Sequence, residues 1–263
     1  MPIGVIVHGA AGRVGREMLT GLSGHDDIQL LAGVDRQASG DWLALTHGCS
    51  IPLALDLEAV IGNIRPLVVV DFTDAKGAMS AARTALPLGV NLVIGSTGLS
   101  EEDVKEIGEL ATRHRVGAVV APNFALGAVL MIHLARIAAR YFDYAEIIEM
   151  HHETKIDAPS GTALATARAM AEARGQPFRL APVEKHTLPG TRGGEVEGIT
   201  IHAMRLPGLM AHQEVVLGTA GQTLSIRHDT INRECYVPGV LMAVRGVVKQ
   251  QGLIYGLDRL LGL

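Results

Sequence analysis

The N-terminal stretch Ile3-Gly4-Val5-Ile6-Val7-His8-Gly9-Ala10-Ala11-Gly12-Arg13-Val14-Gly15 decides the fold of this chain. Ile3 to Val7 is a short apolar run that predicts a strand, and Arg16 to Leu22 predicts a helix. Glycines that end a strand and open a helix have the context that a dinucleotide-binding turn requires. The spacing G-x-x-G-x-x-G differs from the usual G-x-G-x-x-G, so the turn alone is also compatible with an ordinary strand-to-helix connection.

The three glycines and the residues that end the next strand indicate a cofactor. Gly9 permits the tight turn, Gly12 lets the backbone approach a pyrophosphate, and Gly15 lets the helix pack close to the strand. Asp35 lies 20 positions beyond Gly15, where a carboxylate accepts hydrogen bonds from the adenosine ribose. The guanidinium of Arg36 can instead bind the 2′-phosphate of NADP. We therefore predict a nicotinamide cofactor, NADH or NADPH, with the preference between them left open.

Strands and helices alternate over the first half of the chain. Further strands are predicted at Gln29–Val34, Leu67–Phe72, Asn91–Ile94 and Val116–Ala121, and helices at Ala75–Leu86 and Ser100–His114. This alternation predicts an α/β fold with a Rossmann-type, doubly wound parallel sheet. Ligands of such sheets bind beyond the carboxyl ends of the strands. The predicted cofactor-binding residues are Gly9, Ala10, Ala11, Gly12, Arg13, Val14, Asp35, Arg36, Gly95, Ser96, Thr97, Ala121, Pro122, Asn123 and Phe124.

The pattern changes after Phe124. The elements predicted there are a helix at Leu126–Tyr141, a strand at Tyr144–Glu149 and a closing helix at Pro238–Val248. From Thr200 to Arg227 several strands follow one another, with turns at Pro207-Gly208 and Ala220-Gly221-Gln222, and they begin with Thr200–Arg205 and end with Thr223–Arg227. These two strands alternate with the two-residue period of half-exposed strands. The glycine-rich segment from Leu188 to Gly198 is the best candidate for a mobile loop. We therefore predict a second, α+β domain.

A second stretch carries the chemistry: Glu146-Ile147-Ile148-Glu149-Met150-His151-His152-Glu153-Thr154-Lys155-Ile156-Asp157-Ala158-Pro159-Ser160-Gly161-Thr162-Ala163. It begins as a strand, places two histidines and a lysine within five positions, and closes with Ser160 as the predicted N-cap of a helix. Two imidazoles, an ammonium and the N–H groups of a helix start can hold a small dianion while donating a proton. A histidine pair or a lysine alone is also common on solvated surfaces.

Taken together, these motifs resemble the 4-hydroxy-tetrahydrodipicolinate reductase (dihydrodipicolinate reductase) family of bacterial and plant lysine synthesis. The resemblance covers nearly the whole chain. It includes the two stretches above, Asp35-Arg36, Asp71-Phe72-Thr73, Gly95 to Gly98, Asn123-Phe124, Pro189 to Gly194 and Arg205-Leu206-Pro207-Gly208. It implies a dinucleotide-binding domain of residues 1–125 completed by residues 234–263. Residues 126–233 would then form a substrate-binding and oligomerisation domain with a mixed sheet, in a homotetramer.

The resemblance also implies a reaction and its residues. The family's proton donor falls on His151, its essential lysine on Lys155, and its substrate-anion contacts on His152, Gly161 and Thr162. The reaction is the NADH- or NADPH-dependent reduction of 4-hydroxy-tetrahydrodipicolinate, a cyclic dicarboxylate imine, in lysine and diaminopimelate biosynthesis. Hydride addition drives electron density onto the ring nitrogen, which an imidazolium at His151 can protonate near neutral pH. Ser96 stands where the family has threonine, and it keeps the hydroxyl.

Composition argues against other classes of protein. The formal net charge of −4 and the lack of a basic run argue against a nucleic-acid partner. The apolar run at the N-terminus is interrupted at His8-Gly9, so we expect neither a signal peptide nor a membrane partner, and a cytoplasmic location. Cys49 and Cys235 are too few for a structural zinc site, and no metal is expected.

Three alternative functions remain to be weighed. A semialdehyde dehydrogenase needs a cysteine nucleophile, and neither Cys49 nor Cys235 lies in a matching motif. A short-chain dehydrogenase needs Tyr-x-x-x-Lys, which occurs at none of the four tyrosines. A non-catalytic sensor of dinucleotides would have no use for His151 and Lys155.

Overall fold

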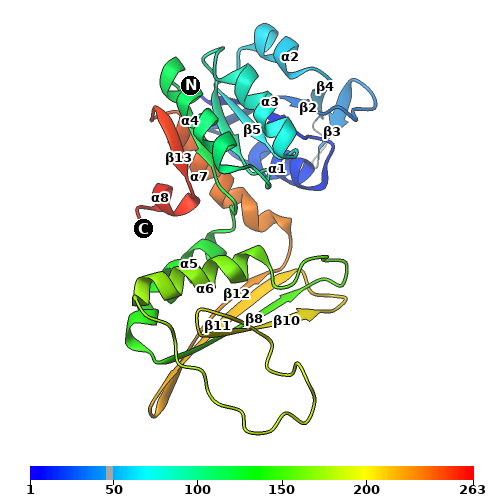
Figure 1. Cartoon of the computed structure of the whole chain (residues 1–263). Helices are drawn as coiled ribbons and strands as arrows, with labels where there is room; N and C mark the ends of the chain where they lie inside the picture. Colours follow the sequence, from blue (N-terminus) through cyan, green and yellow to red (C-terminus); the bar gives the residue numbers. More distant parts are fainter. Residues whose placement is uncertain (46–49) are drawn as a thin grey trace. The chain divides into compact units, whose positions relative to one another are not determined.

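The computed structural model describes residues 1–45 and 50–263, so Cys49 lies outside the described residues. The chain divides into two compact units (Figure 1). The first comprises Met1–Leu126 together with Arg233–Leu263, and the second comprises Gly127–Asn232. Within the described ranges, none of the helices combines the length and the apolar character that a membrane crossing requires.

The first unit is built on an eight-stranded sheet with the order β13-β7-β6-β5-β1-β2-β4-β3. Its strands are β1 (Ile3–His8), β2 (Ile28–Val34), β3 (Trp42–Ala44), β4 (Ser50–Ala54), β5 (Val68–Asp71), β6 (Asn91–Ile94), β7 (Gly117–Val120) and β13 (Gly252–Tyr255). All neighbours run parallel except β3 with β4. The chain passes from β1 to β2 on one side and later to β5 on the other, so strand order reverses beside β1. The predicted Rossmann-type sheet is confirmed.

Helices connect these strands. They are α1 (Arg13–Ser23), α2 (Leu57–Ile64), α3 (Ala75–Ala85), α4 (Glu101–His114), α7 (Val237–Val247) and α8 (Leu257–Leu261), with a short 3-10 turn, η3 (Arg233–Tyr236). The start of α4 agrees with the sequence. The Ser100 hydroxyl accepts a hydrogen bond from Asp103 N–H at 3.1 Å, and the Asp103 carboxylate accepts one from Ser100 N–H at 2.9 Å. This reciprocal capping satisfies two N–H groups that the helix leaves unpaired.

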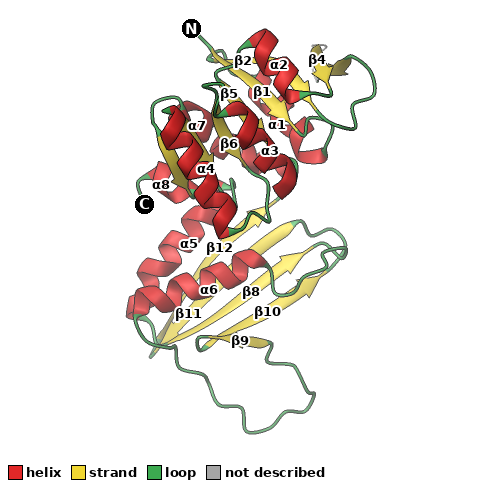
Figure 2. Ribbon diagram, turned by 45° about the horizontal axis from the view of Figure 1, so that its top comes forward, coloured by secondary structure: helices red, strands yellow, loops and turns green. Residues whose placement is uncertain are grey.

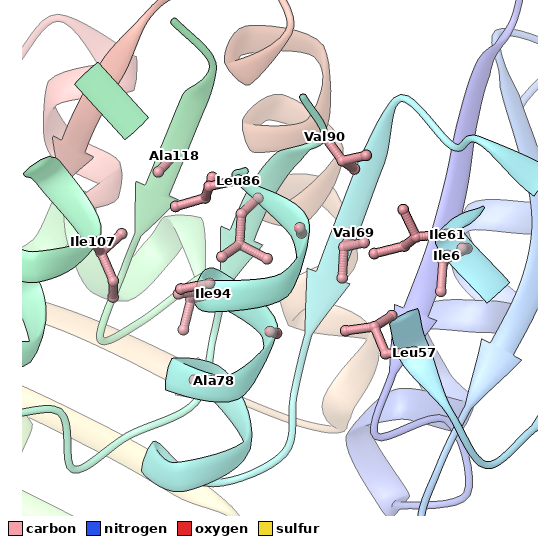
Figure 3. Close-up of a cluster of buried hydrophobic side chains, with 14 of the residues drawn as sticks. Ile6, Leu57, Ile61, Val69, Ala78, Leu86, Val90, Ile94, Ile107 and Ala118 are labelled. Atoms are coloured by element: carbon pink, nitrogen blue, oxygen red, sulfur yellow. The ribbon is translucent and has the colours of Figure 1, made fainter. Parts of the chain in front are cut away.

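The core of the first unit is aliphatic. Every residue of β5, β6 and β7 is buried, as parallel strands covered on both faces require. Figure 3 shows Ile6, Val69 and Ile94 within this core, together with Leu86 from the end of α3. The face of α3 that packs on the sheet is mostly alanine, which lets the helix lie close to the strands. The carboxyl ends of the strands are thereby held at one rigid edge.

The second unit is a five-stranded mixed sheet with the order β12-β11-β8-β10-β9. Its strands are β8 (Tyr144–His151), β9 (Gly194–Val196), β10 (Ile199–Arg205), β11 (Ala211–Thr219) and β12 (Gln222–Thr230). Strands β8 and β10 run parallel, and the other neighbours antiparallel. Figure 2 shows α5 (Leu126–Ala138) and α6 (Gly161–Arg174) on one face of this sheet. The predicted α+β second part with a mixed sheet is confirmed.

The alternation of β8 decides which of its side chains lie under the helices. Ile147 belongs to the buried core of this unit, and Glu149 and His151 follow it at two-residue intervals on the same face. The last strand residue is His151, two positions beyond the predicted end of the strand. The predicted helix at Leu126–Tyr141 is α-helical only to Ala138 and ends in a 3-10 turn, η2 (Ala139–Tyr141). The segment predicted as a mobile loop contains the edge strand β9.

Candidate active site

The residues predicted to bind the cofactor lie at the carboxyl edge of the first sheet. Gly9 follows β1, Asp35 follows β2, Gly95 follows β6 and Ala121 follows β7. Because these strands are parallel neighbours in one sheet, their carboxyl ends share one edge. The exposed residues among the candidates, including Gly12, Arg13, Thr97 and Pro122, are accessible to a ligand there.

The glycine turn has the geometry of an anion cradle. Gly9 has a φ of +85°, and a Cβ on Gly15 would lie 2.0 Å from the Gly9 carbonyl oxygen. Neither position therefore accepts a side chain without rebuilding the turn. Gly12 is the N-cap of α1 and offers no side-chain acceptor. The first N–H groups of α1 are consequently available to an anionic ligand at the helix N-terminus.

Asp35 and Arg36 are held beside this turn. The Asp35 carboxylate accepts hydrogen bonds from Ala11 N–H at 2.9 Å and from Gln37 N–H at 2.8 Å. Arg36 is exposed and donates to Asp74 Oδ2 at 3.1 Å. Asp74 caps α3 through Gly77 N–H, and this bond, together with Arg36, holds the pKa of Asp74 below its usual value. The carboxylate of Asp35 and the guanidinium of Arg36 are thus side by side in the chain but have different partners.

Five of the predicted cofactor residues are buried: Gly9, Ala10, Ser96, Ala121 and Phe124. The Ser96 hydroxyl donates to Asp71 Oδ1 at 2.5 Å. Phe124 packs edge-on against Phe72 with ring centroids 5.9 Å apart. In this structure, these residues therefore pack within the edge of the sheet and do not project from it.

Asp71, quoted from the sequence only as part of the motif Asp71-Phe72-Thr73, is the centre of a buried network. Its carboxylate is fully buried and lies 2.6 Å from His8 Nδ1. It also accepts hydrogen bonds from the hydroxyls of Ser96 and Thr73. These contacts join the ends of β1, β5 and β6, so the network fixes the edge at which the glycine turn begins.

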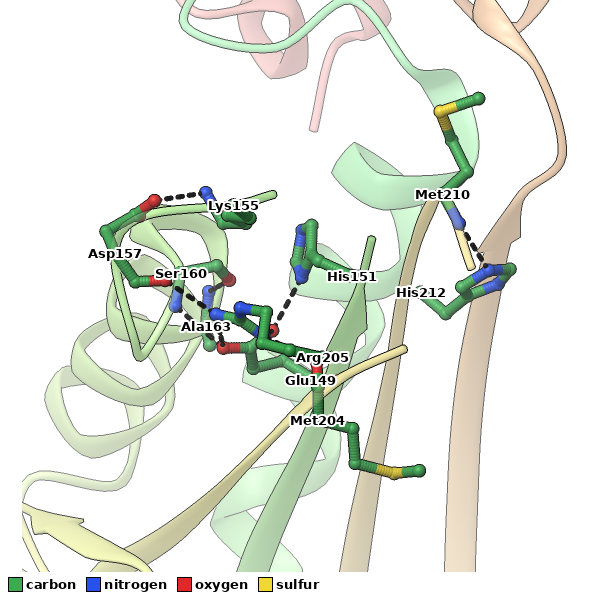
Figure 4. A network of polar contacts seen from close by, with 10 residues as sticks. All are labelled: Glu149, His151, Lys155, Asp157, Ser160, Ala163, Met204, Arg205, Met210 and His212. Atoms are coloured by element: carbon green, nitrogen blue, oxygen red, sulfur yellow. Dashed lines mark hydrogen bonds and ion pairs between the residues drawn. The ribbon is translucent and has the colours of Figure 1, made fainter. Parts of the chain in front are cut away.

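The second cluster of polar groups lies at the end of β8 in the second unit (Figure 4). It brings together His151, Lys155 and the first turn of α6, as the sequence predicted. Lys155 donates to Asp157 Oδ1 at 2.6 Å. His152 lies outside the strand, and its Nδ1 is 2.7 Å from the Thr154 hydroxyl. His152 is therefore turned to its own loop and not to His151.

Glu149 orients His151. Glu149 is fully buried, and its Oε2 lies 2.5 Å from His151 Nδ1. Arg205 binds both carboxylate oxygens, at 2.8 and 2.9 Å, and also donates to the Asp157 carbonyl oxygen at 2.6 Å. A carboxylate only accepts hydrogen bonds, so His151 must donate through Nδ1. The other ring nitrogen, Nε2, is left for a different partner.

Burial and charge act against one another at this pair. Burial favours a raised pKa for Glu149, but Arg205 and His151 outweigh it and leave the pKa of Glu149 below its usual value. Burial lowers the pKa of His151, Glu149 opposes this, and the charges of Lys155 and Arg205 lower it further. The pKa of His151 consequently lies below its usual value. A histidine in this state releases a proton more readily than one in water.

Ser160 connects this pair to the start of α6. Its hydroxyl accepts a hydrogen bond from Ala163 N–H at 3.2 Å, as an N-cap does, and its own N–H donates to Glu149 Oε1 at 3.1 Å. The N–H groups of Gly161 and Thr162 precede the first intrahelical bond of α6. Apart from Gly161 itself, its chain neighbours and the backbone of α6, no described residue has an atom within 4 Å of the position that a Gly161 side chain would take. This first turn can therefore bind an anion close to His151 and Lys155.

Glu149, Arg205, Asp71 and His8 lie in motifs quoted from the sequence, but none of them was predicted to have a role in a site. Glu149 and Arg205 are 56 positions apart in the chain, and His8 and Asp71 are 63 apart. One signal was local: Glu149 and His151 are two positions apart on a strand and so share a face. The others required the pairing of strands, which a single sequence does not state.

Comparison with known proteins identifies the family. The model of the dihydrodipicolinate reductase N-terminus matches residues 3–124, and that of its C-terminus matches residues 127–261. The 4-hydroxy-tetrahydrodipicolinate reductase of Dehalococcoides mccartyi is 50% identical over 100% of this chain and 99% of its own. That of Moorella thermoacetica is 49% identical over 98% of each.

A solved structure agrees with these relatives. The dipicolinate-bound dihydrodipicolinate reductase from Paenisporosarcina sp. TG-14 has a TM-score of 0.89 and is 39% identical, over 98% of this chain and 99% of its own. The predicted resemblance is confirmed, and the semialdehyde dehydrogenase, short-chain dehydrogenase and sensor alternatives are set aside. The chain therefore belongs to the dihydrodipicolinate reductase family, oxidoreductases that use NADH or NADPH to reduce 4-hydroxy-tetrahydrodipicolinate in lysine and diaminopimelate biosynthesis.

Proposed function

We propose that His151 is the proton donor of this reductase and that Lys155, His152 and the first turn of α6 bind the substrate's carboxylates. The observation that carries this proposal is the hydrogen bond between Glu149 and His151 Nδ1 at 2.5 Å. With Nδ1 held by a carboxylate, Nε2 is the nitrogen from which a proton can leave. An imidazole that is held through Nδ1 and exposes Nε2 is suited to act as a general acid toward the ring nitrogen of the substrate.

The groups around His151 suit a dianionic substrate. Lys155 supplies a positive charge, and the N–H groups of Gly161 and Thr162 supply hydrogen-bond donors at the positive end of a helix. Lys155 is bound to the Asp157 carboxylate in this structure. A substrate carboxylate would replace Asp157 at Lys155, since both make the same kind of contact. The bound dipicolinate of the Paenisporosarcina relative is a ligand of this dicarboxylate class.

The glycine turn suits the cofactor. The cradle between Gly9 and Gly15 leaves no room for a Cβ, and Gly12 caps α1 without a side chain. Its N–H groups would hold the pyrophosphate, and Asp35 would bind the ribose hydroxyls. Arg36 would bind the 2′-phosphate of NADPH. The bound nicotinamide supplies the hydride.

We also propose that the chain works in the cytoplasm as a homotetramer built through the second sheet. The face of this sheet opposite α5 and α6 carries apolar and charged side chains together, including Ile148, Val216 and the ion pair of Glu146 with Arg192. The apolar side chains on this face are of the kind that the core of a subunit interface buries, with charged groups at its rim. Sedimentation equilibrium would test the proposal, with a mass near 27.8 kDa at all concentrations as the contrary result.

A coupled assay tests the catalytic proposal. A dihydrodipicolinate synthase would supply the unstable substrate, and oxidation of NADH or NADPH would be followed by absorbance. The parent chain should oxidise either cofactor only when the synthase product is present. Oxidation that His151→Gln leaves unchanged would contradict the role of His151 while leaving the family membership intact.

A further inference from the structure

The Glu149 carboxylate has an unusual set of partners for a buried acid. Four hydrogen bonds reach its two oxygens: one from His151, two from Arg205 and one from Ser160 N–H. Burying an ion pair of this kind costs desolvation energy that the pair barely recovers, and apolar residues of similar size often stabilise a fold as well. Stability alone is therefore a weak reason for placing two charges under α6.

The register of the sheet explains how the three side chains meet. Glu149 and His151 lie on the same face of β8, and Arg205 is the direct neighbour of His151 on β10. The residue opposite Glu149 on β10 is Ala203. This small side chain leaves the guanidinium of Arg205 free to reach back to Glu149, as Figure 4 shows.

We propose that Glu149 and Arg205 are positioning residues that act on His151 in opposite directions. Glu149 holds the Nδ1–H and so presents Nε2 to the substrate, while Arg205 takes up part of the charge of Glu149 and keeps His151 ready to release its proton. This proposal rests on the proposed role of His151 as proton donor. Neither residue exchanges a proton in the reaction.

The protons balance in one step. His151 begins as an imidazolium with hydrogen on both nitrogens, and the Nε2–H bond breaks as an N–H bond forms on the reduced ring. The histidine is left neutral, with its remaining proton on Nδ1 and still donated to Glu149. A proton from water then restores the imidazolium. Glu149 remains a carboxylate throughout, which agrees with its pKa lying below the usual value.

The groups that bear on His151 come from three places. Glu149 lies on its own strand, Arg205 on β10, and Lys155 in the loop that leads to α6. Glu149 favours the imidazolium, and the two cations disfavour it. Asp157 moderates both cations, since it pairs with Lys155 and its carbonyl oxygen accepts from Arg205. Burial is the largest influence on the pKa of His151 and lowers it, and the balance between Glu149 and Arg205 then shifts the pH at which His151 loses its proton.

Opposite charge changes should move the pH profile in opposite directions. Because the acid must be protonated, kcat/KM falls as pH rises through the pKa of His151. Glu149→Gln removes the charge that favours the imidazolium, so this alkaline limb should shift to lower pH by about one unit. Arg205→Gln removes a charge that disfavours it, so the limb should shift to higher pH. Shifts in the same direction, or none, would overturn the proposal.

The tautomer of His151 gives a second readout that does not depend on turnover. In full-length protein with ¹⁵N-labelled histidine, neutral His151 should carry its proton on Nδ1 in the parent. Glu149→Gln should mix the two tautomers and lower kcat by roughly 10- to 1000-fold, since a misplaced tautomer disables a positioned imidazole. A retained Nδ1–H tautomer in Glu149→Gln would contradict the positioning role.

Strand β8 supplies a matched control. Glu146 also contacts an arginine and a histidine, Arg192 and His202, but on the other face of the sheet. Glu146→Gln should leave the alkaline limb in place, and a shift equal to that of Glu149→Gln would count against a specific role.

If Arg205→Gln fails to fold, the double variant Glu149→Gln/Arg205→Gln removes both charges. The alkaline limb of the double variant should lie at a higher pH than that of Glu149→Gln alone. A limb at the same or a lower pH would refute the role of Arg205.

Failure of this inference is distinguishable from failure of the proposed function. If His151→Gln abolishes turnover while both positioning variants keep the parent pH profile, only the inference fails. If His151→Gln keeps near-normal kcat while Glu149→Gln still mixes the tautomers, the proton-donor role fails instead.

Discussion

Within the described residues, each unit contains one histidine whose Nδ1 meets a fully buried carboxylate, and the two pairs have nearly the same nitrogen-to-oxygen distance. His8 and Asp71 are 2.6 Å apart, and His151 and Glu149 are 2.5 Å apart, with the two imidazoles 15% and 14% exposed. Their surroundings differ. Asp71 is bound by the hydroxyls of Ser96 and Thr73, which tie strand ends together, whereas Glu149 is bound by Arg205 beside Lys155. The comparison teaches that neighbouring cations and helix N–H groups, and not the pair itself, mark a histidine as a catalytic candidate.

Replacing the histidine of the second pair should have the largest effect. His151→Gln removes the proposed general acid, so kcat should fall by about 10²–10⁴-fold while KM changes less. Steady-state kinetics together with the dissociation constant of NADH would measure this. A near-normal kcat would contradict the proposed difference between the two pairs. A large loss of NADH binding would also contradict it, because the histidine would then belong to the cofactor site.

Removing Lys155, the cation that distinguishes the second pair, should have the second largest effect. Lys155→Ala should lower kcat and raise KM together, because the ammonium acts on both ground state and transition state. The loss of one charge-assisted contact predicts a fall of kcat/KM by about 10- to 100-fold. Lys105→Ala, an exposed helix lysine in the first unit, is the control and should leave kcat/KM unchanged. A Lys155→Ala effect confined to KM would indicate uniform binding of the substrate.

Changing the residues after β2 should affect the first unit alone. Arg36→Ala should weaken NADPH by about 1.5–3 kcal/mol, the value of a charge-assisted contact, and NADH far less. Asp35→Ala should do the reverse. Fluorescence titration with each reduced cofactor would measure both constants. Equal losses for both cofactors in either variant would remove the assignment of these two residues.

Replacing the histidine of the first pair should affect folding more than turnover. His8→Gln leaves Asp71 buried with a weakened set of donors, which should cost about 1–3 kcal/mol in the free energy of unfolding. Thermal melting would record this as a lower Tm, and kcat of the folded enzyme should stay within about twofold, well below the loss that a missing general acid causes. A loss of kcat like that of His151→Gln, with Tm unchanged, would reverse the comparison.

Binding of the cofactor together with a substrate analogue should produce the smallest measurable change. The proposed cofactor residues lie in one unit and the proposed substrate residues in the other, and the reaction requires the two ligands to meet. Adding NADH with pyridine-2,6-dicarboxylate should therefore lower the radius of gyration measured by small-angle scattering, since the ternary complex closes the protein. Each ligand alone is the control. An unchanged radius in the ternary complex would contradict closure.

Sequence patterns predicted most of the first unit because its signals are local. Strand β6 was predicted to the residue, and the capping of α4 follows from Ser100 and Asp103 alone. A strand between the turns at Pro207-Gly208 and Ala220-Gly221-Gln222 was predicted, but the bounds of β11 were not, because its first half is rich in polar residues. One of these, Gln213, is buried and donates a hydrogen bond to Thr166. Strands β3 and β9 have three residues each and depend on pairing with a neighbour.

In the candidate site, too, the groups that are close in sequence were predicted and those brought together by strand pairing were not. His151, Lys155 and the start of α6 are close in sequence, so one motif predicted their proximity. Arg205 reaches Glu149 only because β10 pairs in parallel with β8, and no local pattern contains that information. Electrostatic control of a site is therefore harder to predict from sequence than the reacting groups themselves.

Ser160 has a consequence for the thermodynamics of substrate binding. Its N–H, hydroxyl and carbonyl groups bind Glu149, Ala163 and Leu164 respectively. The spacing between His151, the proposed proton donor, and the first turn of α6 is therefore fixed when the chain folds. Substrate binding need not order these groups again, so little conformational entropy is lost on their account, and more of the contact energy remains as affinity.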